Sequence, residues 1–421
     1  MTCRAVGRYG SMDGVRENGT CRFGAIPYAE PPLGPLRFRP PVPRQWQGRV
    51  DATRPMPVAP QWPSRLNEAV GGFEAEQSED CLKLTIWTPA PDSRRRPVLI
   101  WLHGGAWQSG GAAIARYAGA RLAARGDLVV VAPNYRLSAL GWLYVPGQTS
   151  NVGLLDQEAA IRWVRDNIGA FGGDPTNITL MGQSAGAASI ACLLAREPPS
   201  GRVILQSPWI EEKAFLSVER AAAIGEAFLR VAQAPDLDAA RRLSLETLLE
   251  AQRTVIQAWK CPHTGMAPSV FGPVADGAVL PADLPAGLRH AASRADVLIG
   301  YTLNELAAFP DIEINETSQR WGDDAFGAPA RRWAARAKSA GRKAWLYRFD
   351  YAPGPRFGAC HCIELPFVFD THGHFSDAPM MKGAQANDLE RLTRRLQESW
   401  IDFVHGRPPW QEQWPGMVLF C

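Results

Sequence analysis

Gly182-Gln183-Ser184-Ala185-Gly186 follows a stretch that predicts a strand, Asn177-Ile178-Thr179-Leu180-Met181, and precedes a run of small residues suited to a helix. This order is typical of a nucleophile elbow, in which a sharp strand-to-helix turn exposes a serine hydroxyl. Glycines two residues before and two after the serine remove Cβ atoms that would clash in so tight a bend. Because the five-residue pattern also arises by chance, the flanking strand and helix carry the prediction that Ser184 is a nucleophile.

A second glycine-rich segment lies upstream, where His103-Gly104-Gly105 follows an apolar run over residues 97–102. The run has the length of a buried strand, so the glycines fall at the carboxyl edge of a sheet. Backbone N–H groups of Gly104 and Gly105, together with that of Ala185 after the serine, predict an oxyanion hole. The alternative is a tight turn between a strand and a helix that has no part in catalysis.

Several other blocks follow one another in a characteristic order along the chain. They are residues 23–34 and 36–38 near the amino end, residues 78–87, residues 134–137, and the long run from 151 to 186. Together with the glycine loop, these blocks resemble the type-B carboxylesterases, the α/β-hydrolase family that also contains the cholinesterases. The resemblance covers most of the chain and implies an α/β-hydrolase fold.

The resemblance also implies which residues complete a catalytic triad with Ser184. Glu305 ends a segment, residues 301–305, that is similar to the acid-bearing loop of the family, and His361 lies in residues 358–369, which are similar to its histidine loop. Without the resemblance, Glu305 reads as readily as a solvated surface charge. By the same reasoning, His361 reads as a structural or exposed histidine.

These assignments predict acyl transfer. His361 is expected to take the Ser184 proton as the hydroxyl attacks an ester carbonyl, while Glu305 fixes the imidazole tautomer. The expected substrate is a small carboxylic ester, with amide or carbamate hydrolysis as close neighbours in mechanism. A different class stays open, a non-catalytic interaction protein on the same scaffold, because some members of the family are adhesion molecules.

Two tryptophans near the predicted site are candidates for the substrate pocket. Trp107 follows the glycine loop, and Trp209 lies in a segment, residues 206–209, that resembles one near the active site of the family. Bulky aromatic side chains there suit apolar substrates. The alternative is that both tryptophans pack in the core.

Two groups of charged residues have structural interpretations. Arg37 and Glu79 fall at positions that the family uses for a structural ion pair, and the alternative is two unrelated surface charges. Arg94-Arg95-Arg96 lies in a turn rich in Pro, Asp and Ser, so we expect these three side chains to be solvated.

Composition is that of an ordinary globular enzyme. Of the 421 residues, 46% are hydrophobic and 21% are charged, and the formal net charge is only +3. So small a charge gives no electrostatic case for nucleic acid or a membrane surface, and no apolar run approaches the ~20 residues of a membrane span. We therefore expect a small-molecule ester as the partner, and a monomer.

The eight cysteines form no obvious framework. The resemblance implies a disulfide partner for Cys81 in secreted relatives, but Ala59 stands in the corresponding segment here. With no apolar secretory region at the amino end, reduced thiols and a cytoplasmic location are predicted. Cys360-His361-Cys362 lacks a second ligand pair at zinc-site spacing, so we predict no metal, and no other cofactor is implied.

Alternating strand and helix patterns predict a mostly parallel sheet with helices on both faces, built as one domain over residues 1–421. The expected strands are residues 97–102, 128–132, 177–181, 202–206, 296–300 and 343–351, and helical apolar stripes recur over residues 161–168 and 389–403. Between Glu305 and His361 the chain is shorter than the family pattern. This predicts a shortened lid region and a shallower, more accessible active site.

Overall fold

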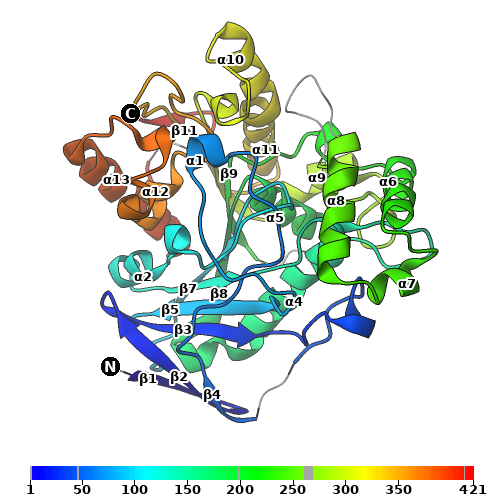
Figure 1. Cartoon of the computed structure of the whole chain (residues 1–421). Helices are drawn as coiled ribbons and strands as arrows, with labels where there is room; N and C mark the ends of the chain where they lie inside the picture. Colours follow the sequence, from blue (N-terminus) through cyan, green and yellow to red (C-terminus); the bar gives the residue numbers. More distant parts are fainter. Residues whose placement is uncertain (1, 45–46, 198–199, 260–268, 412) are drawn as a thin grey trace.

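One twisted sheet runs through the molecule (Figure 1). The computed structural model describes residues 2–44, 47–197, 200–259, 269–411 and 413–421. In this described part the sheet has 12 strands, and its order is β1-β2-β3-β5-β7-β6-β8-β9-β10-β11-β12, with β4 beside β2. The strands are β1 (Thr2–Gly7), β2 (Gly10–Glu17), β3 (Thr20–Pro27), β4 (Gly48–Asp51), β5 (Lys83–Thr88), β6 (Arg96–Leu102), β7 (Val129–Pro133), β8 (Gly173–Gln183), β9 (Arg202–Gln206), β10 (Asp296–Thr302), β11 (Ala344–Phe349) and β12 (Met417–Phe420).

The sheet has two halves with different strand directions. From β7 through β6 to β12 all neighbouring strands are parallel. The six predicted strands all lie in this half, and none departs from the observed ends by more than four residues. The path from β1 through β2, β3 and β5 to β7 is antiparallel, and the sequence patterns did not reveal these amino-terminal strands. Strand β1, for example, alternates between exposed and buried positions as a strand should. Its buried residues are only Cys3 and Ala5, which give a weak hydrophobic pattern in the sequence.

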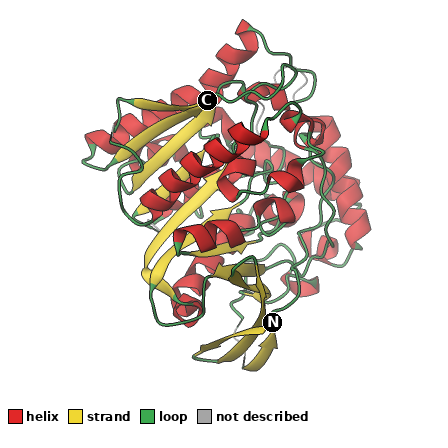
Figure 2. Ribbon diagram, turned by 90° about the vertical axis from the view of Figure 1, so that its left-hand side faces the viewer, coloured by secondary structure: helices red, strands yellow, loops and turns green. Residues whose placement is uncertain are grey.

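Helices cover both faces of the sheet, as Figure 2 shows. They are α1 (Asn67–Val70), α2 (Ala120–Gly126), α3 (Ser138–Trp142), α4 (Val152–Asn167), α5 (Ala185–Arg196), α6 (Val218–Val231), α7 (Leu237–Arg241), α8 (Leu245–Trp259), α9 (Leu284–Ala291), α10 (Glu316–Gly322), α11 (Ala328–Ser339), α12 (Leu365–Phe369) and α13 (Ala386–Val404). The predicted stripes over residues 161–168 and 389–403 fall in and just after α4 and in α13. Helices α2 and α13 pack on each other, whereas α4 and α5 pack on β8.

The prediction that the thiols are reduced is wrong for one pair of cysteines. Cys3 in β1 and Cys21 in β3 form a disulfide, with their Cα atoms 6.0 Å apart. The bond joins two strands that both pair with β2, and a sequence pattern alone does not reveal that they approach. Cys81 is free and buried, as the missing partner near Ala59 implied. A cytoplasmic location stays a prediction, and the disulfide removes the support that reduced thiols gave it.

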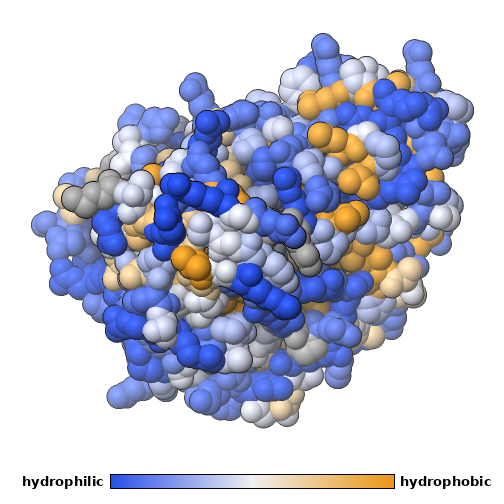
Figure 3. Space-filling model, turned by 90° about the horizontal axis from the view of Figure 1, so that it is seen from below, coloured by the Kyte–Doolittle hydropathy of each residue, from blue (hydrophilic) through white to orange (hydrophobic). Residues whose placement is uncertain are grey.

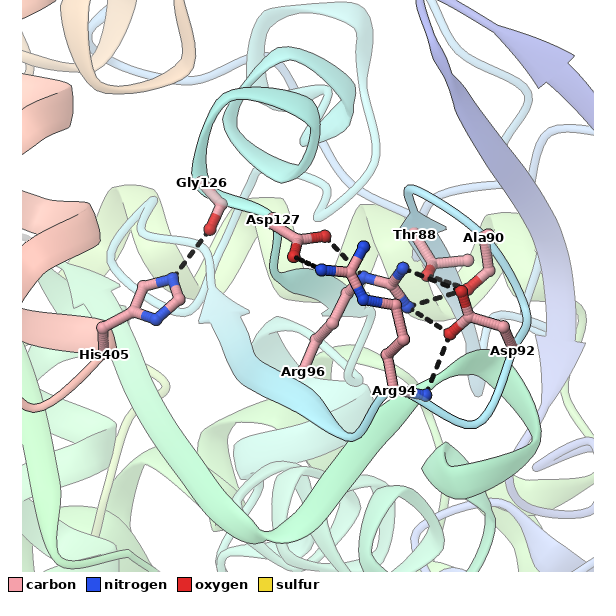
Figure 4. Close-up of polar contacts among 8 residues, drawn as sticks. All are labelled: Thr88, Ala90, Asp92, Arg94, Arg96, Gly126, Asp127 and His405. Carbon is pink, nitrogen blue, oxygen red and sulfur yellow. Dashed lines mark hydrogen bonds and ion pairs between the residues drawn. The ribbon is translucent and has the colours of Figure 1, made fainter.

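The expectation of three solvated arginines is also wrong for one of them (Figure 4). Arg96 is 4% exposed and begins β6, where its guanidinium forms ion pairs with Asp92 and Asp127, each at 2.6 Å. Arg94 and Arg95 are exposed, and Arg94 also reaches Asp127. The Arg96 guanidinium is the main cause that lowers the pKa of Asp92 to about 2. Arg96 is thus a buried anchor that joins the turn before β6 to the end of α2.

Hydrophilic residues cover most of the face seen from below, and hydrophobic residues form separate groups on it (Figure 3). Such scattered apolar groups are ordinary for a protein surface. Of the helices in the described ranges, none combines the length and the apolar character that a bilayer crossing requires.

Strand register brings the predicted site segments to one edge of the sheet. Leu102 at the end of β6 lies opposite Gly182 of β8, and Gln183 lies opposite Gln206 at the end of β9. The next strand, β10, is parallel to β9 and ends at Thr302, just before Glu305. Because the carboxyl ends of parallel strands meet at one edge, the glycine loop, the elbow and the acid loop are neighbours.

Candidate active site

The turn at the junction of β8 and α5 has the geometry predicted for a nucleophile elbow. Ser184 has φ 55° and ψ −121°, a strained backbone conformation for a residue with a side chain. A Cβ atom on Gly182 would lie 2.6 Å from the carbonyl carbon of Gly186, and one on Gly186 would lie 2.0 Å from the carbonyl oxygen of Leu102. The Ser184 N–H donates to the Gln206 carbonyl at 2.9 Å, which fixes the turn against β9.

Glu305 and His361 form a buried pair near the elbow. His361 Nδ1 lies 2.5 Å from Glu305 Oε2, and both side chains are 1% exposed. Glu305 begins the 3₁₀ helix η5 (Glu305–Ala308), and its second carboxyl oxygen accepts the Thr302 N–H at 2.8 Å. The aromatic rings of Phe309 and Phe326 pack on the imidazole, with ring centroids 5.7 and 5.1 Å away. A carboxylate at Nδ1 holds the proton on that nitrogen and leaves Nε2 as an acceptor.

The acceptor nitrogen of His361 faces a residue to which the sequence patterns gave no role. Its Nε2 lies 3.1 Å from Gln183 Nε2, and Gln183 is 1% exposed. Between these described residues, no hydrogen bond joins Ser184 Oγ to His361. The Gln183 amide lies instead at the nitrogen that a triad uses to receive the serine proton.

The glycine loop after β6 is held from several sides. His103 Nδ1 lies 2.8 Å from the Gly104 carbonyl oxygen, and the Tyr135 hydroxyl donates to the His103 carbonyl at 2.7 Å. Burial lowers the pKa of His103 to about 4, so the ring is neutral at pH 7. Within the described ranges, the N–H groups of Gly104, Gly105 and Ala185 have no hydrogen-bond acceptor. Three unpaired donors therefore lie near Ser184, whose Cβ is 3.1 Å from the position of a Cβ on Gly104.

Both candidate pocket tryptophans are buried. Trp107 is 0% exposed, donates its indole N–H to Ser189 Oγ at 2.9 Å and packs on Trp142 at 5.8 Å between centroids. Trp209 is 6% exposed and belongs to the core. This burial favours the core alternative, and a role in the substrate pocket stays a prediction.

Arg37 and Glu79 form the expected ion pair. Arg37 Nε and Nη2 each donate to a Glu79 carboxyl oxygen at 2.6 Å, and the two side chains are 11% and 9% exposed. Arg37 Nη1 also donates to the backbone carbonyls of Arg241 and Leu243. The alternative of two unrelated surface charges is excluded, because the two charged groups are in direct contact and nearly buried. Arg37 also ties this pair to the end of α7 and the residues just after it.

Glu364 is a buried acid beside the site that sequence reasoning missed. It is 0% exposed, Oε1 accepts the Gln206 amide at 3.0 Å, and Oε2 has no partner among the described residues. Burial, followed by the negative charge of Glu305, raises the pKa of Glu364 to about 7. The available signal was its position three residues after His361, at the start of α12.

Replacing Glu364 by Gln should remove a pH dependence of stability. The folded-state pKa of about 7 exceeds the ordinary value of 4.5, so between these values the folded chain binds more protons than the unfolded chain. In the parent, the free energy of unfolding should therefore fall by about 3 kcal/mol as pH rises through this window. Urea unfolding of both proteins at pH 5 and pH 8 measures the difference. If the free energy of unfolding of the E364Q variant changes with pH as much as that of the parent, Glu364 is not the group that causes this pH dependence.

Among the described residues, no group of three or more His, Cys, Asp or Glu side chains has the arrangement of a metal site. In the Cys360-His361-Cys362 segment, both imidazole nitrogens already face other groups, Glu305 and Gln183.

An elbow serine beside a buried histidine–carboxylate pair, at the carboxyl edge of a partly parallel sheet with helices on both faces, defines the α/β-hydrolase class. A solved PNB esterase structure superposes with a TM-score of 0.89 at 31% identity, covering 100% of this chain and 96% of that one. The sequence model of the Carboxylesterase family matches residues 5–320, and the chain belongs to this family.

Named relatives agree with this family. The para-nitrobenzyl esterase of Bacillus subtilis (strain 168) is 35% identical over an alignment of 458 positions, which covers 97% of this chain and 91% of the relative. The phenmedipham hydrolase of Pseudarthrobacter oxydans is 34% identical over an alignment of 465 positions, which covers 98% of this chain and 91% of the relative. The chain is therefore a carboxylic ester hydrolase, and the interaction-protein alternative is set aside.

Proposed function

We propose that the chain hydrolyses small carboxylic esters through an acyl-enzyme intermediate, with Ser184 as nucleophile, His361 as general base and Glu305 as the orienting acid. In acylation, Ser184 Oγ bonds to the ester carbonyl carbon while its proton passes to His361 Nε2. The bond from that carbon to the alcohol oxygen then breaks, and Nε2 gives its proton to the leaving alcohol. Water, deprotonated by the same imidazole, attacks the acyl group, releases the acid and restores the serine.

The observation that carries this proposal is the 2.5 Å contact between His361 Nδ1 and Glu305 Oε2, completely buried at the sheet edge where the elbow presents Ser184. A buried carboxylate at Nδ1 stabilises the imidazolium that forms when the ring takes a proton. Such a pair serves no evident packing purpose, since burying two ionisable groups is costly without a compensating role.

We further propose that the N–H groups of Gly104, Gly105 and Ala185 form the oxyanion hole. Their lack of acceptors among the described residues supports this role, because backbone donors inside a fold are normally paired. Preorganised donors act where negative charge develops on the carbonyl oxygen, and they need no rearrangement during the reaction.

A small ester is the proposed substrate because the para-nitrobenzyl esterase, related over nearly the whole chain, is named for that activity. Amide and carbamate hydrolysis stay as neighbouring candidates that use the same acylation step. Trp209 is the proposed pocket wall of the two tryptophans, since it is slightly exposed whereas Trp107 is fully enclosed. A readily accessible site and a monomeric enzyme remain predictions.

The test combines labelling with a substrate panel. An organophosphonate should modify Ser184, identified by peptide mass spectrometry, and short-chain p-nitrophenyl esters should be hydrolysed with release of the acid. The rates of hydrolysis of matched p-nitroanilides and p-nitrophenyl carbamates, compared with those of the esters, show whether amides or carbamates are better substrates. A folded sample that neither takes the label nor hydrolyses any ester would reject the proposal.

Replacing Gly105 by Ala should reduce kcat strongly. Gly105 has φ +111°, and an added Cβ would lie 2.0 Å from the Ser109 carbonyl oxygen, so the loop must move. Losing one oxyanion donor costs on the order of 10²–10³ in kcat. Gly147→Ala is the matched control, because Gly147 has φ +78° but no atom within 4 Å of an added Cβ. Comparable kcat values for the two variants would argue against this oxyanion hole.

A further inference from the structure

Gln183 lies at the centre of the site, immediately before the nucleophile. An added Cβ on Gly104 would lie 2.7 Å from Gln183 Oε1, so the carboxamide rests against the glycine loop. Its Nε2 lies 3.1 Å from His361 Nε2. Burial raises the pKa of the Cys362 thiol, and a hydrogen bond with Gln183 is among the effects that oppose this rise. The side chain therefore contacts the glycine loop, the base and the residue after the base.

The direction of the contact with His361 follows from the carboxylate on the other side of the ring. Since Glu305 accepts at Nδ1, that nitrogen bears the proton, and Nε2 carries only a lone pair. The carboxamide must then present its N–H₂ group, which donates to Nε2. Imidazole has a single lone pair at this nitrogen, and general-base catalysis needs the same lone pair for the Ser184 proton.

We propose that Gln183 is a positioning residue that caps the acceptor lone pair of His361 in the ligand-free enzyme, so that acylation requires its hydrogen bond to give way to one from Ser184. This inference rests on the proposed function and extends it. While the cap is in place, Ser184 has no base to take its proton. Substrate binding at the glycine loop, where the other end of the carboxamide lies, is suited to release it.

Gln183→Met tests the cap, because methionine retains the length of the side chain and removes the donor. Acylation should become faster by about two- to tenfold, the equivalent of one ordinary hydrogen bond. The readouts are the second-order rate constant for organophosphonate labelling of Ser184 and the kcat for a p-nitrophenyl ester, with KM unchanged. A loss of packing alone would slow both rates, so the sign of the change separates the two roles.

Gln157→Met is the matched control. Gln157 is likewise buried, at 0% exposed, and donates to Ser189 Oγ at 3.3 Å, away from His361. This variant should show no acceleration. If the organophosphonate labels a folded Q183M variant at the same rate as the parent, or more slowly, the proposed cap is wrong. Failure of the parent itself to be labelled would instead reject the proposed function.

A second measurement needs no variant and decides the matter if Q183M does not fold. In a crystal structure of the phosphonylated parent enzyme, the Gln183 carboxamide nitrogen should lie beyond hydrogen-bond distance from His361 Nε2, which should face the modified serine oxygen. A carboxamide still within 3.5 Å of Nε2 in that adduct would overturn the proposal.

Discussion

Replacing Ser184 by Ala is expected to lower kcat for p-nitrophenyl esters on the order of 10⁴–10⁶-fold, because no other group in the proposed mechanism forms the acyl-enzyme. Residual rate would come from the oxyanion donors and from substrate binding. The backbone of the elbow is held by the Ser184 N–H bond to Gln206 and by the close approach of Gly186 to Leu102. Neither contact uses the hydroxyl, so the variant should fold normally.

Two measurements accompany the assay of the Ser184→Ala variant. Its thermal unfolding midpoint should match that of the parent, and the organophosphonate should fail to modify it. Substantial esterase turnover by a pure, unlabelled variant would show that another residue is the nucleophile. A variant that is inactive because it is unfolded would be recognised by its melting curve.

The largest loss of stability is expected from Asp156→Ala. Asp156 in α4 is fully buried and pairs with Arg136 through Oδ1 at 2.6 Å and Oδ2 at 2.8 Å, and Oδ2 also accepts the Arg136 N–H at 3.1 Å. Removing the carboxylate leaves a buried guanidinium without a counter-charge. Such a change costs about 3–5 kcal/mol in the free energy of unfolding.

Glu158→Ala provides the comparison on the same helix. Glu158 pairs with Arg162 and Arg196, but its side chain is 33% exposed, so its loss should cost about 0–1 kcal/mol. Urea unfolding of the three proteins, with esterase activity measured in parallel, gives both numbers. If the two substitutions destabilise equally, the Arg136–Asp156 pair is not the anchor that its burial indicates.

The parts of the fold that sequence patterns predicted are those with strong local signals. Strand β6 contains a continuous apolar run over residues 97–102, and the elbow needs two glycines at fixed positions for steric reasons, so sequence patterns predicted both. The family resemblance supplied Glu305 and His361, which the structure brings within 2.5 Å of each other. Neither residue has a local pattern that identifies it.

What the patterns missed depends on contacts between distant segments. The Cys3–Cys21 bond requires β1 and β3 to approach across β2, and the burial of Arg96 requires Asp127 from the end of α2. Glu364 looks like a surface charge in sequence because nothing local shows that the chain covers it. The sequence patterns gave Gln183 no role, because its contact with His361 joins residues 178 positions apart.

Gln206 links Ser184, the proposed nucleophile, to the interior of the protein. Its carbonyl accepts the Ser184 N–H from the adjoining strand, and its side chain reaches both Glu364 and the Trp400 indole. The proposed nucleophile is thus mounted on two paired, buried strands, whose close packing resists a change of shape toward different esters. Directed evolution toward bulkier substrates would accordingly gain most from libraries in the surrounding loops, and least from mutations in β8 or β9.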